Sequence, residues 1–152
     1  MFSKACEYGI RATIFIAWNT SNDNRVNLKE IAAEVGSPEA FTAKILQLLV
    51  KSKIIKSTKG ASGGFTLNTN ATPSLMLSTL VSAIDGDSIY RSCGLGLKSC
   101  NAKEPCPMHK QFMVVREQLR EMLENTPISD LTEDYGDGLT YLKRIPKTIE
   151  LN

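Results

Sequence analysis

The sequence lacks the residues and motifs on which most enzymes depend. Its 152 residues include one histidine, and they contain no CxxC pair, no GxxxxGK[ST] phosphate loop and no pattern of paired carboxylates. No apolar run approaches the roughly 18 residues that a membrane-spanning helix needs. The first residues also lack the long apolar core of a secretory signal peptide. We therefore expect a non-enzymatic, cytoplasmic protein that makes no contact with a membrane.

Charge is distributed unevenly along the chain, although the formal net charge is only +2. Residues 1–67 contain nine Lys and Arg against five Asp and Glu, whereas residues 68–152 contain nine against eleven. Between Ala40 and Ile84 there are five lysines and no acidic residue. This local excess of positive charge is typical of a surface that contacts a phosphate backbone, although a solvated basic face would have the same composition.

Apolar spacing and capping signals predict two helices in the first 36 residues. Apolar side chains recur at helical spacing from residue 3 to about residue 19. A second helix is expected over 28–35, because Asn27 followed by Glu30 is a capping signal and Gly36 is suited to end a helix.

The following segment predicts a winged helix-turn-helix. A third helix should run from a Ser37 cap to about Lys51, with Phe41, Ile45, Leu48 and Leu49 on its buried side. Strands are expected over 54–58 and 65–67, joined by a glycine-rich wing. The third helix should enter the major groove of DNA and the wing should hold the neighbouring groove. The candidate DNA-contacting residues are Ser37, Glu39, Ala40, Phe41, Thr42, Lys44, Lys59, Gly60, Ser62 and Gly63.

The second half of the chain predicts two more helices, over 73–83 and about 107–125. The longer one carries apolar residues at spacings of four, three, four and three, which is typical of a coiled-coil seam. These residues are Met108, Phe112, Val115, Leu119 and Met122. Such a seam can pack on its own domain, but we expect it to form a homodimer.

The expected fold is mainly α with a small β wing. A winged helix-turn-helix domain should span 1–86, and a cysteine loop with a dimerisation helix should span 87–132. Ser129 is a candidate cap for one last helical turn. Residues 133–152 are polar and are expected to form a poorly ordered tail.

Three cysteines, Cys93, Cys100 and Cys106, lie in one short loop, and His109 follows three residues after the last. Soft thiolates crowded in a loop with glycine and proline are suited to a soft metal or an iron–sulfur cluster. In a reducing compartment they indicate metal ligands or redox centres rather than structural disulfides. Cys6 is a further thiol that could reach the same site, but we favour its interpretation as a buried small residue of the first helix.

Together these features resemble the Rrf2 family of bacterial winged-helix regulators, which includes the IscR, NsrR, RsrR and CymR types. The resemblance covers residues 1 to about 131. It is carried by segments 7–11, 28–32, 37–49 and 59–65 and by the loop that holds the three cysteines.

The resemblance implies a homodimeric transcription factor that binds a pseudo-palindromic DNA operator, and we expect a repressor. It also implies that Cys93, Cys100 and Cys106 hold a 2Fe-2S or 4Fe-4S cluster that senses iron–sulfur status, nitric oxide or redox stress. In IscR-like members the fourth ligand is a histidine three positions after the last cysteine, which His109 matches. In NsrR-like members it is an acidic residue of the partner subunit's first helix, which Glu7 matches. The sequence does not choose between the two.

Other interpretations of the same residues stay open. Six residues separate Cys93 from Cys100, one more than is common in the family. The Cys₃His set would also suit a structural zinc ion, and Cys93 and Cys100 could form a thiol–disulfide switch. A winged-helix protein that binds a protein partner instead of DNA is a further alternative. CymR-like members lack the cysteines, which argues against that branch.

Overall fold

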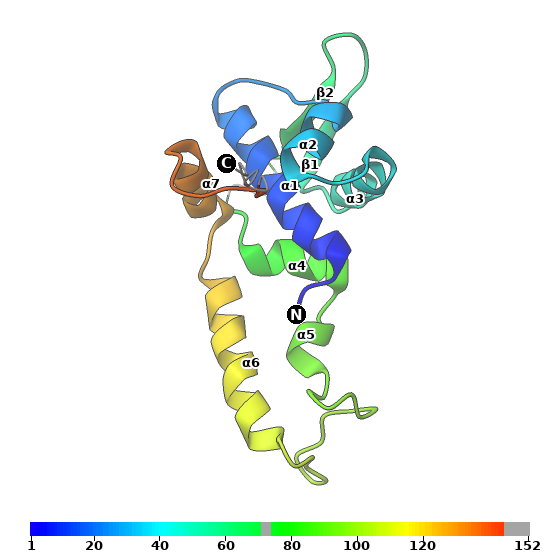
Figure 1. Cartoon of the computed structure of the whole chain (residues 1–152), viewed down its shortest axis with the longest axis vertical. Helices are drawn as coiled ribbons and strands as arrows, with labels where there is room; N and C mark the ends of the chain where they lie inside the picture. Colours follow the sequence, from blue (N-terminus) through cyan, green and yellow to red (C-terminus); the bar gives the residue numbers. More distant parts are fainter. Residues whose placement is uncertain (71–73, 145–152) are drawn as a thin grey trace, which may run out of the picture.

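The computed structural model describes residues 1–70 and 74–144. Its elements are α1 (Lys4–Ser21), α2 (Leu28–Val35), α3 (Glu39–Lys51), β1 (Ile55–Thr58), β2 (Gly64–Leu67), α4 (Leu77–Asp85), α5 (Ser88–Arg91), α6 (His109–Glu124) and α7 (Ile128–Gly136). One body contains α1 to α4, the hairpin and α7, while α5, α6 and the loop between them extend away from it (Figure 1). The expected fold, mainly α with a small β wing, is confirmed. No helix in the described ranges is both long and apolar enough to cross a membrane.

The core of the body forms around α1, which packs against α2, α3, α4, α7 and β2. Its centre consists of fully buried aliphatic side chains: Ile16, Ile31, Leu46, Leu49, Ile54 and Leu80. Removal of such side chains from water is the main stabilising contribution in a domain of this size. Of the positions expected on the buried side of α3, Ile45 and Leu49 are buried while Phe41 and Leu48 are partly buried, and Leu46 is buried although it was not predicted.

The capping signals fix the start and end of α2. The Asn27 side chain accepts a hydrogen bond from the Glu30 backbone N–H at 3.0 Å, and the Glu30 carboxylate accepts one from the Asn27 N–H at 2.7 Å. Both arms of the expected capping box are thus present. Gly36 ends the helix in the left-handed conformation, with φ 69°.

The expectation that Ser37 caps α3 is wrong. The capping position is Pro38, and no side chain caps this helix. Ser37 is buried one residue earlier, and its Oγ has no hydrogen-bond partner among the described residues. Because α3 starts at Glu39, Ser37 stands one residue before the capping position, which is why it makes no cap hydrogen bond.

The wing is an antiparallel hairpin in which Ile55 pairs with Leu67 and Thr58 with Gly64, so the two strands start within one residue of their predicted positions. Gly63 lies so close to the Thr58 carbonyl that a side chain there would collide with it. An isolated antiparallel backbone bridge also joins Val26 to Phe65, with N–O distances of 3.3 and 2.8 Å. The hairpin is therefore tied to the segment before α2.

The second half begins differently from the sequence prediction. Helix α4 starts at Leu77, after an extended Met76, while Pro73 lies outside the described residues. The Leu77 N–H donates to the Thr126 carbonyl at 2.9 Å, and the Ile128 N–H donates to the Leu75 carbonyl at 2.8 Å. These bonds join the start of α4 to the link between α6 and α7. The short helix α5 has no clear signal in the sequence.

The expectation of a poorly ordered tail is wrong for residues 133–144. Helix α7 continues to Gly136, so Ser129 lies within a nine-residue helix rather than capping a single turn. The Tyr135 ring packs edge-on against Trp18, with a centroid separation of 5.7 Å, and its hydroxyl donates to the Glu34 carboxylate at 3.0 Å. Burial, followed by the bond to Glu34, raises the pKa of Tyr135 to about 12. Residues 145–152 lie outside the described part.

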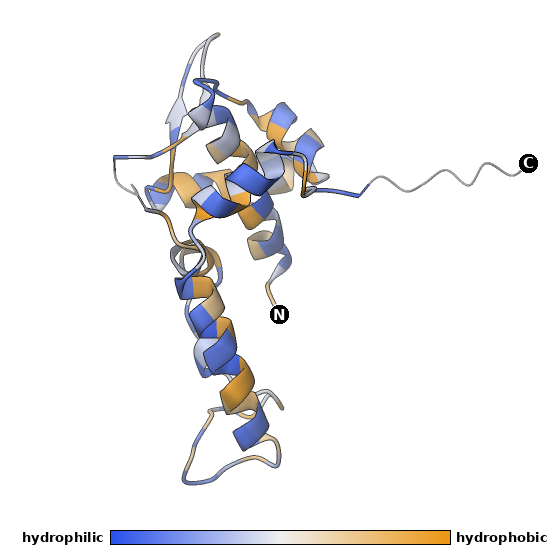
Figure 2. Cartoon of the chain, turned by 90° about the vertical axis from the view of Figure 1, so that its left-hand side faces the viewer, coloured by the Kyte–Doolittle hydropathy of each residue, from blue (hydrophilic) through white to orange (hydrophobic). Residues whose placement is uncertain are grey.

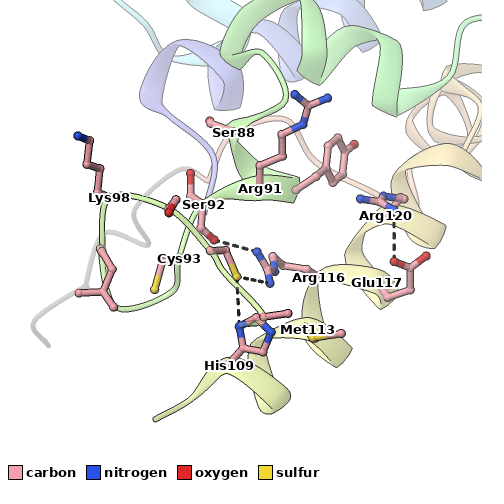
Figure 3. A pocket seen from close by; sticks show the side chains of 16 residues that line it. Ser88, Arg91, Ser92, Cys93, Lys98, His109, Met113, Arg116, Glu117 and Arg120 are labelled. Atoms are coloured by element: carbon pink, nitrogen blue, oxygen red, sulfur yellow. Dashed lines mark hydrogen bonds and ion pairs between the residues drawn. The ribbon is translucent and has the colours of Figure 1, made fainter. Parts of the chain in front are cut away.

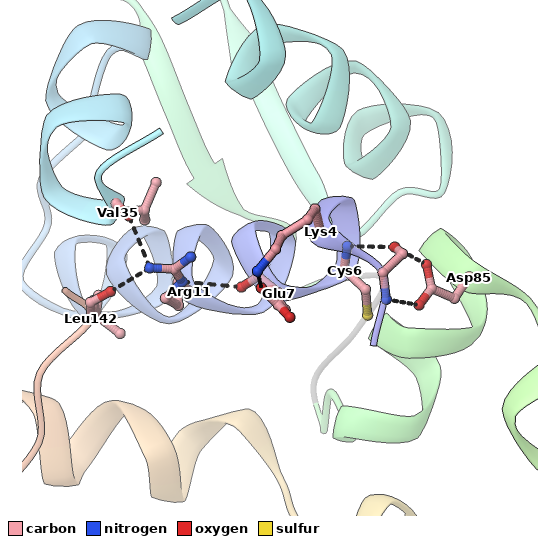
Figure 4. Close-up of polar contacts among 8 residues, drawn as sticks. Lys4, Cys6, Glu7, Arg11, Val35, Asp85 and Leu142 are labelled. Carbon is pink, nitrogen blue, oxygen red and sulfur yellow. Dashed lines mark hydrogen bonds and ion pairs between the residues drawn. The ribbon is translucent and has the colours of Figure 1, made fainter. Parts of the chain in front are cut away.

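The segment after α7 is held against the end of α2. Leu142 is 6% exposed, and its carbonyl accepts a hydrogen bond from Arg11 Nη1 at 3.0 Å. The same nitrogen donates to the Val35 carbonyl at 3.0 Å (Figure 4). Lys143 Nζ donates to the Ala33 carbonyl at 2.6 Å. Two cations thus satisfy carbonyls at the C-terminal end of α2, where positive charge is favourable.

We expect Leu142→Ala to destabilise the protein by about 2 kcal/mol, because a buried leucine side chain is lost and a cavity is left behind. Urea unfolding followed by circular dichroism would measure the change. Leu139→Ala is the matched control, since Leu139 is 70% exposed three residues earlier. Equal unfolding midpoints for the two variants would show that the segment does not stabilise the domain.

Candidate metal centre and nucleic-acid interface

The loop between α5 and α6 lies at the end of α6 farthest from the body (Figures 1 and 2). Cys93, Cys100 and His109 line an open hollow between this loop and α6 (Figure 3). A side chain at position 94 would collide with the Phe112 ring, so Gly94 allows the loop to lie directly on α6. All four cysteines of the chain are free thiols.

Cys100 meets two side chains of α6. Its Sγ lies 3.4 Å from His109 Nδ1 and accepts a hydrogen bond from Arg116 Nη2 at 3.1 Å. Arg116 also donates through Nη1 to the Ser92 carbonyl at 3.0 Å. Thus α6 supplies an imidazole and a guanidinium to the same sulfur.

His109 is only 8% exposed, although it stands at the first position of α6. Its Nε2 is buried and has no hydrogen-bond partner among the described residues. A buried ring nitrogen without a partner is costly, and coordination of an ion is one way to satisfy it. This atom is therefore suited to a metal ligand, as are the neighbouring thiols.

Cys93 is buried and has the environment of a stabilised thiolate. Backbone hydrogen bonds from Leu95 and Leu97 are the largest causes that lower its pKa. A hydrogen bond from the Cys106 side chain and the positive charge of Arg116 lower it further. The loop donors thus form two pairs, Cys93 with Cys106 and Cys100 with His109.

The two pairs do not form a single closed set. Within residues 1–70 and 74–144, no three side chains of Cys, His, Asp or Glu converge closely enough to hold a metal ion. The donor types, and a His109 Nε2 without a partner among the described residues, fit a thiolate-bound metal group. The two pairs are, however, not brought together around one point in this structure. The fit therefore rests on the chemistry of the donors.

Glu7 lies on α1, away from the loop of its own chain (Figures 1 and 4). Its carboxylate pairs with Lys4 Nζ at 2.7 Å, and this hydrogen bond is the main cause that lowers the pKa of Glu7. Glu7 does not line the hollow of this chain.

Cys6, next to Glu7, is fully buried in the core, as we expected. Burial is the main cause that raises its pKa to about 12, and Asp85 contributes further. Burial thus disfavours the thiolate form that a metal would need, and Cys6 does not line the hollow between the loop and α6.

The predicted DNA-contacting residues of α3 divide into two groups. Glu39, Ala40 and Lys44 are exposed. Thr42 is 1% exposed, and its hydroxyl donates to the Pro38 carbonyl at 3.0 Å. The predicted base or phosphate contact of Thr42 is therefore corrected, because its side chain faces the core.

Phe41 also faces inward for the most part, since its ring packs edge-on against Tyr8 with a centroid separation of 5.8 Å. This packing suits a side chain that anchors the helix on the core, as expected from its place on the buried side of α3. Gln47 and Lys51, which were not among the predicted residues, are also exposed on α3. Their spacing from Lys44, three and seven residues, places all three on one helix face and was the available signal.

The wing residues Lys59, Gly60 and Ser62 are exposed, and Gly63 is partly buried. Gly60 has φ 101°, and its carbonyl accepts a hydrogen bond from the Gly63 N–H at 3.0 Å. Arg25 Nη1 donates to the Ser62 carbonyl at 3.4 Å, which places an additional cation beside the wing. Arg25 was not among the predicted residues because it lies far from the wing in sequence.

The apolar seam of α6 is divided between two environments. Phe112 and Leu119 are partly buried against their own chain, while Met108, Val115 and Met122 are exposed. Figure 2 shows apolar positions along α6 where it extends from the body. One edge of the seam thus packs in this chain and the other has no cover within the described residues.

Comparison with known proteins shows similarity over most of the chain. The family model described as "Rrf2: Iron-dependent Transcriptional regulator" matches residues 2–134. The chain is 30% identical over 134 residues to a "Putative HTH-type transcriptional regulator" of Aquifex aeolicus, covering 86% of this chain and 90% of that protein. It is 23% identical to the HTH-type transcriptional regulator IscR of Pectobacterium atrosepticum, with 95% and 93% coverage.

Solved structures show the same fold. The global cysteine regulator CymR of B. subtilis superposes with a TM-score of 0.72 at 20% identity, over 88% of this chain and 96% of that chain. IscR of T. potens superposes with a TM-score of 0.69 at 18% identity, over 92% and 91%.

Proposed function

This chain belongs to the Rrf2 family of DNA-binding transcriptional regulators, and from that premise we propose that it senses its signal through an iron–sulfur cluster held by the loop between α5 and α6. The supporting observation is that Cys93, Cys100 and His109 line one hollow, and that the buried Nε2 of His109 has no partner among the described residues. The signal classes are iron–sulfur status, nitric oxide and redox stress.

Cys93, Cys100 and Cys106 would hold the cluster as thiolates, of either the 2Fe-2S or the 4Fe-4S type. The fourth ligand would be His109 of the same chain or Glu7 of the partner chain in a homodimer. When bound, the cluster supplies iron that exchanges electrons and reacts with nitric oxide. His109 is already beside Cys100, whereas Glu7 would have to exchange its ion pair with Lys4 for the metal.

Transmission to DNA would use contacts of α1. Glu7 lies one helical turn before Arg11, which contacts the end of α2, and Tyr8 contacts Phe41 at the start of α3. A ligand from α1 of one subunit would thus fix the helix-turn-helix of that subunit against the loop of the other. A coupling free energy of about 1.4 kcal/mol would be enough for a tenfold change in operator affinity.

On DNA, α3 would lie in the major groove, with its exposed Lys44 and Gln47 toward base edges or phosphates. Lys59 and the wing would hold the adjacent groove. Two subunits would then recognise a pseudo-palindrome with half-sites about one helical turn apart. We expect repression when such a site overlaps a promoter.

A thiol–disulfide switch is the second candidate, because Cys93 has a lowered pKa and a hydrogen bond from Cys106. A structural zinc ion at the same Cys₃His set is a further alternative. Metal content separates the three possibilities, since only a cluster combines iron, sulfide and visible absorption.

We expect anaerobically purified or reconstituted protein to be coloured and to contain iron and acid-labile sulfide. A variant in which Cys93, Cys100 and Cys106 are all alanine should lose the cluster and change its operator response while remaining folded. Absorption spectra, metal and sulfide assays and gel-shift titrations would test this. Cys6→Ala is the control, which should keep the cluster. Colourless wild-type protein after reconstitution, or protein that contains zinc, would contradict the proposal.

We expect Lys44→Gln and Lys59→Gln each to weaken operator binding and to reduce the slope of log K against log salt by about 1, because each removes one phosphate contact. Lys110→Gln, an exposed lysine of α6, is the control with an unchanged slope. Fluorescence anisotropy at several salt concentrations would measure the slopes. An unchanged slope in both test variants would place the interface elsewhere.

We expect Val115→Glu to convert the homodimer to monomers, because it places a charge in the exposed edge of the seam. Val115 is 56% exposed and the neighbouring Val114 is 59% exposed, but Val114 lies about 100° around the helix. Val114→Glu is therefore the matched control. Sedimentation velocity would measure the states, and a dimer that persists in Val115→Glu would contradict the seam as the interface.

A further inference from the structure

Arg116 contacts the cysteine loop at two separate points. One guanidinium nitrogen donates to the Cys100 sulfur at 3.1 Å, and the other donates to the Ser92 carbonyl at 3.0 Å (Figure 3). Its Nε donates to the Phe112 carbonyl, one turn earlier on α6, at 3.4 Å. Because the guanidinium is planar and rigid, these bonds fix the two points of the loop relative to each other and to α6.

The two points are the ones that matter for ligation. Ser92 immediately precedes Cys93, and Cys100 is the second candidate ligand. A single side chain therefore holds the backbone beside one ligand and the sulfur of the next. No loop residue between 94 and 99 makes such a bond to Arg116 among the described residues.

The charge of Arg116 is directed at sulfur rather than at a carboxylate. Among the described residues, Arg116 forms no ion pair, whereas its neighbour on the same helix, Arg120, pairs with Glu117 at 3.4 Å. Arg116 is also partly buried, so water screens its charge less than at an open surface. A partly buried cation with no anionic partner is stabilised when negative charge is placed beside it.

We propose that Arg116 is a positioning residue for the cluster, and that its hydrogen bond to the Cys100 sulfur raises the cluster's reduction potential. This rests on the proposed function. One-electron reduction adds negative charge to a thiolate-bound cluster, and an N–H donor and a positive charge at a ligand sulfur stabilise that form. Arg116 thereby sets the redox level to which the regulator responds.

The test compares reduction potentials of the full-length reconstituted protein, titrated anaerobically with dithionite and followed by visible absorption. Arg116→Gln keeps an amide donor and removes the charge. We expect it to shift the ratio of reduced to oxidised cluster at least tenfold toward the oxidised form, equivalent to 59 mV for a one-electron couple. Arg116→Lys keeps the positive charge but loses the planar guanidinium that bonds to two points at once. It should give a smaller shift of the reduction potential in the same direction.

Arg120→Gln is the matched control. Arg120 lies one turn further along α6, stacks over Tyr90 at 5.4 Å and makes no hydrogen bond to a cysteine in the described residues. Its removal should leave the potential at the wild-type value. Equal potentials for wild type and Arg116→Gln, or an equal shift in Arg120→Gln, would overturn the inference.

The failure modes are distinguishable. If Arg116→Gln retains no cluster, Arg116→Lys decides, and a wild-type potential in that variant overturns the inference. Cluster loss from both Arg116 variants supports the positioning role, provided that both melt like the wild type and that Arg120→Gln is loaded. Wild-type protein that assembles no cluster would refute the proposed function itself.

Discussion

The Arg11 guanidinium joins three parts of the chain that are distant in sequence, and the position of the helix-turn-helix depends on it. Its Nη1 donates to the carbonyls of Val35 and Leu142, and the group lies 4.4 Å from the centre of the Tyr8 ring. A partly buried cation remains stable only where its donors are satisfied. The end of α2, the segment after α7 and the face of α1 are therefore held in one arrangement.

Local signals predicted the body well because they act over a few residues. Asn27 and Glu30 form the expected capping box, and Gly36 ends α2 as expected. The two failures have different causes. Ser37 has the right chemistry for a cap, but α3 begins later than expected and Pro38 takes the capping position. The order of residues 133–144 rests on Tyr135 and Leu142, whose partners Glu34 and Arg11 lie 101 and 131 residues earlier in the chain.

The residue types of the candidate site could be predicted from the sequence, but the contacts that hold those residues in place could not. The cysteines are conspicuous in sequence because the donor chemistry is carried by the residue itself. The burial of His109 and the bonds of Arg116 to Ser92 and Cys100 depend on how the loop folds back over α6, which Gly94 allows. Likewise, the apolar seam of α6 can be recognised in the sequence by its regular spacing. Its division into a packed edge and an exposed edge depends on tertiary contacts.

The position of the loop limits how a signal can reach DNA. Within the described residues of one chain, the packed route from the loop runs along α6 to α4 and from there to α1 or α3, because the loop itself lies at the far end of α6 (Figure 1). That route crosses several apolar interfaces, where a small shift at the loop is spread over many contacts. A ligand from the partner's α1 would shorten the route to one helical turn, from Glu7 to Arg11, and so to the carbonyl of Val35. A homodimer in which each loop faces the other subunit's α1 would therefore transmit cluster loss more directly than a monomer.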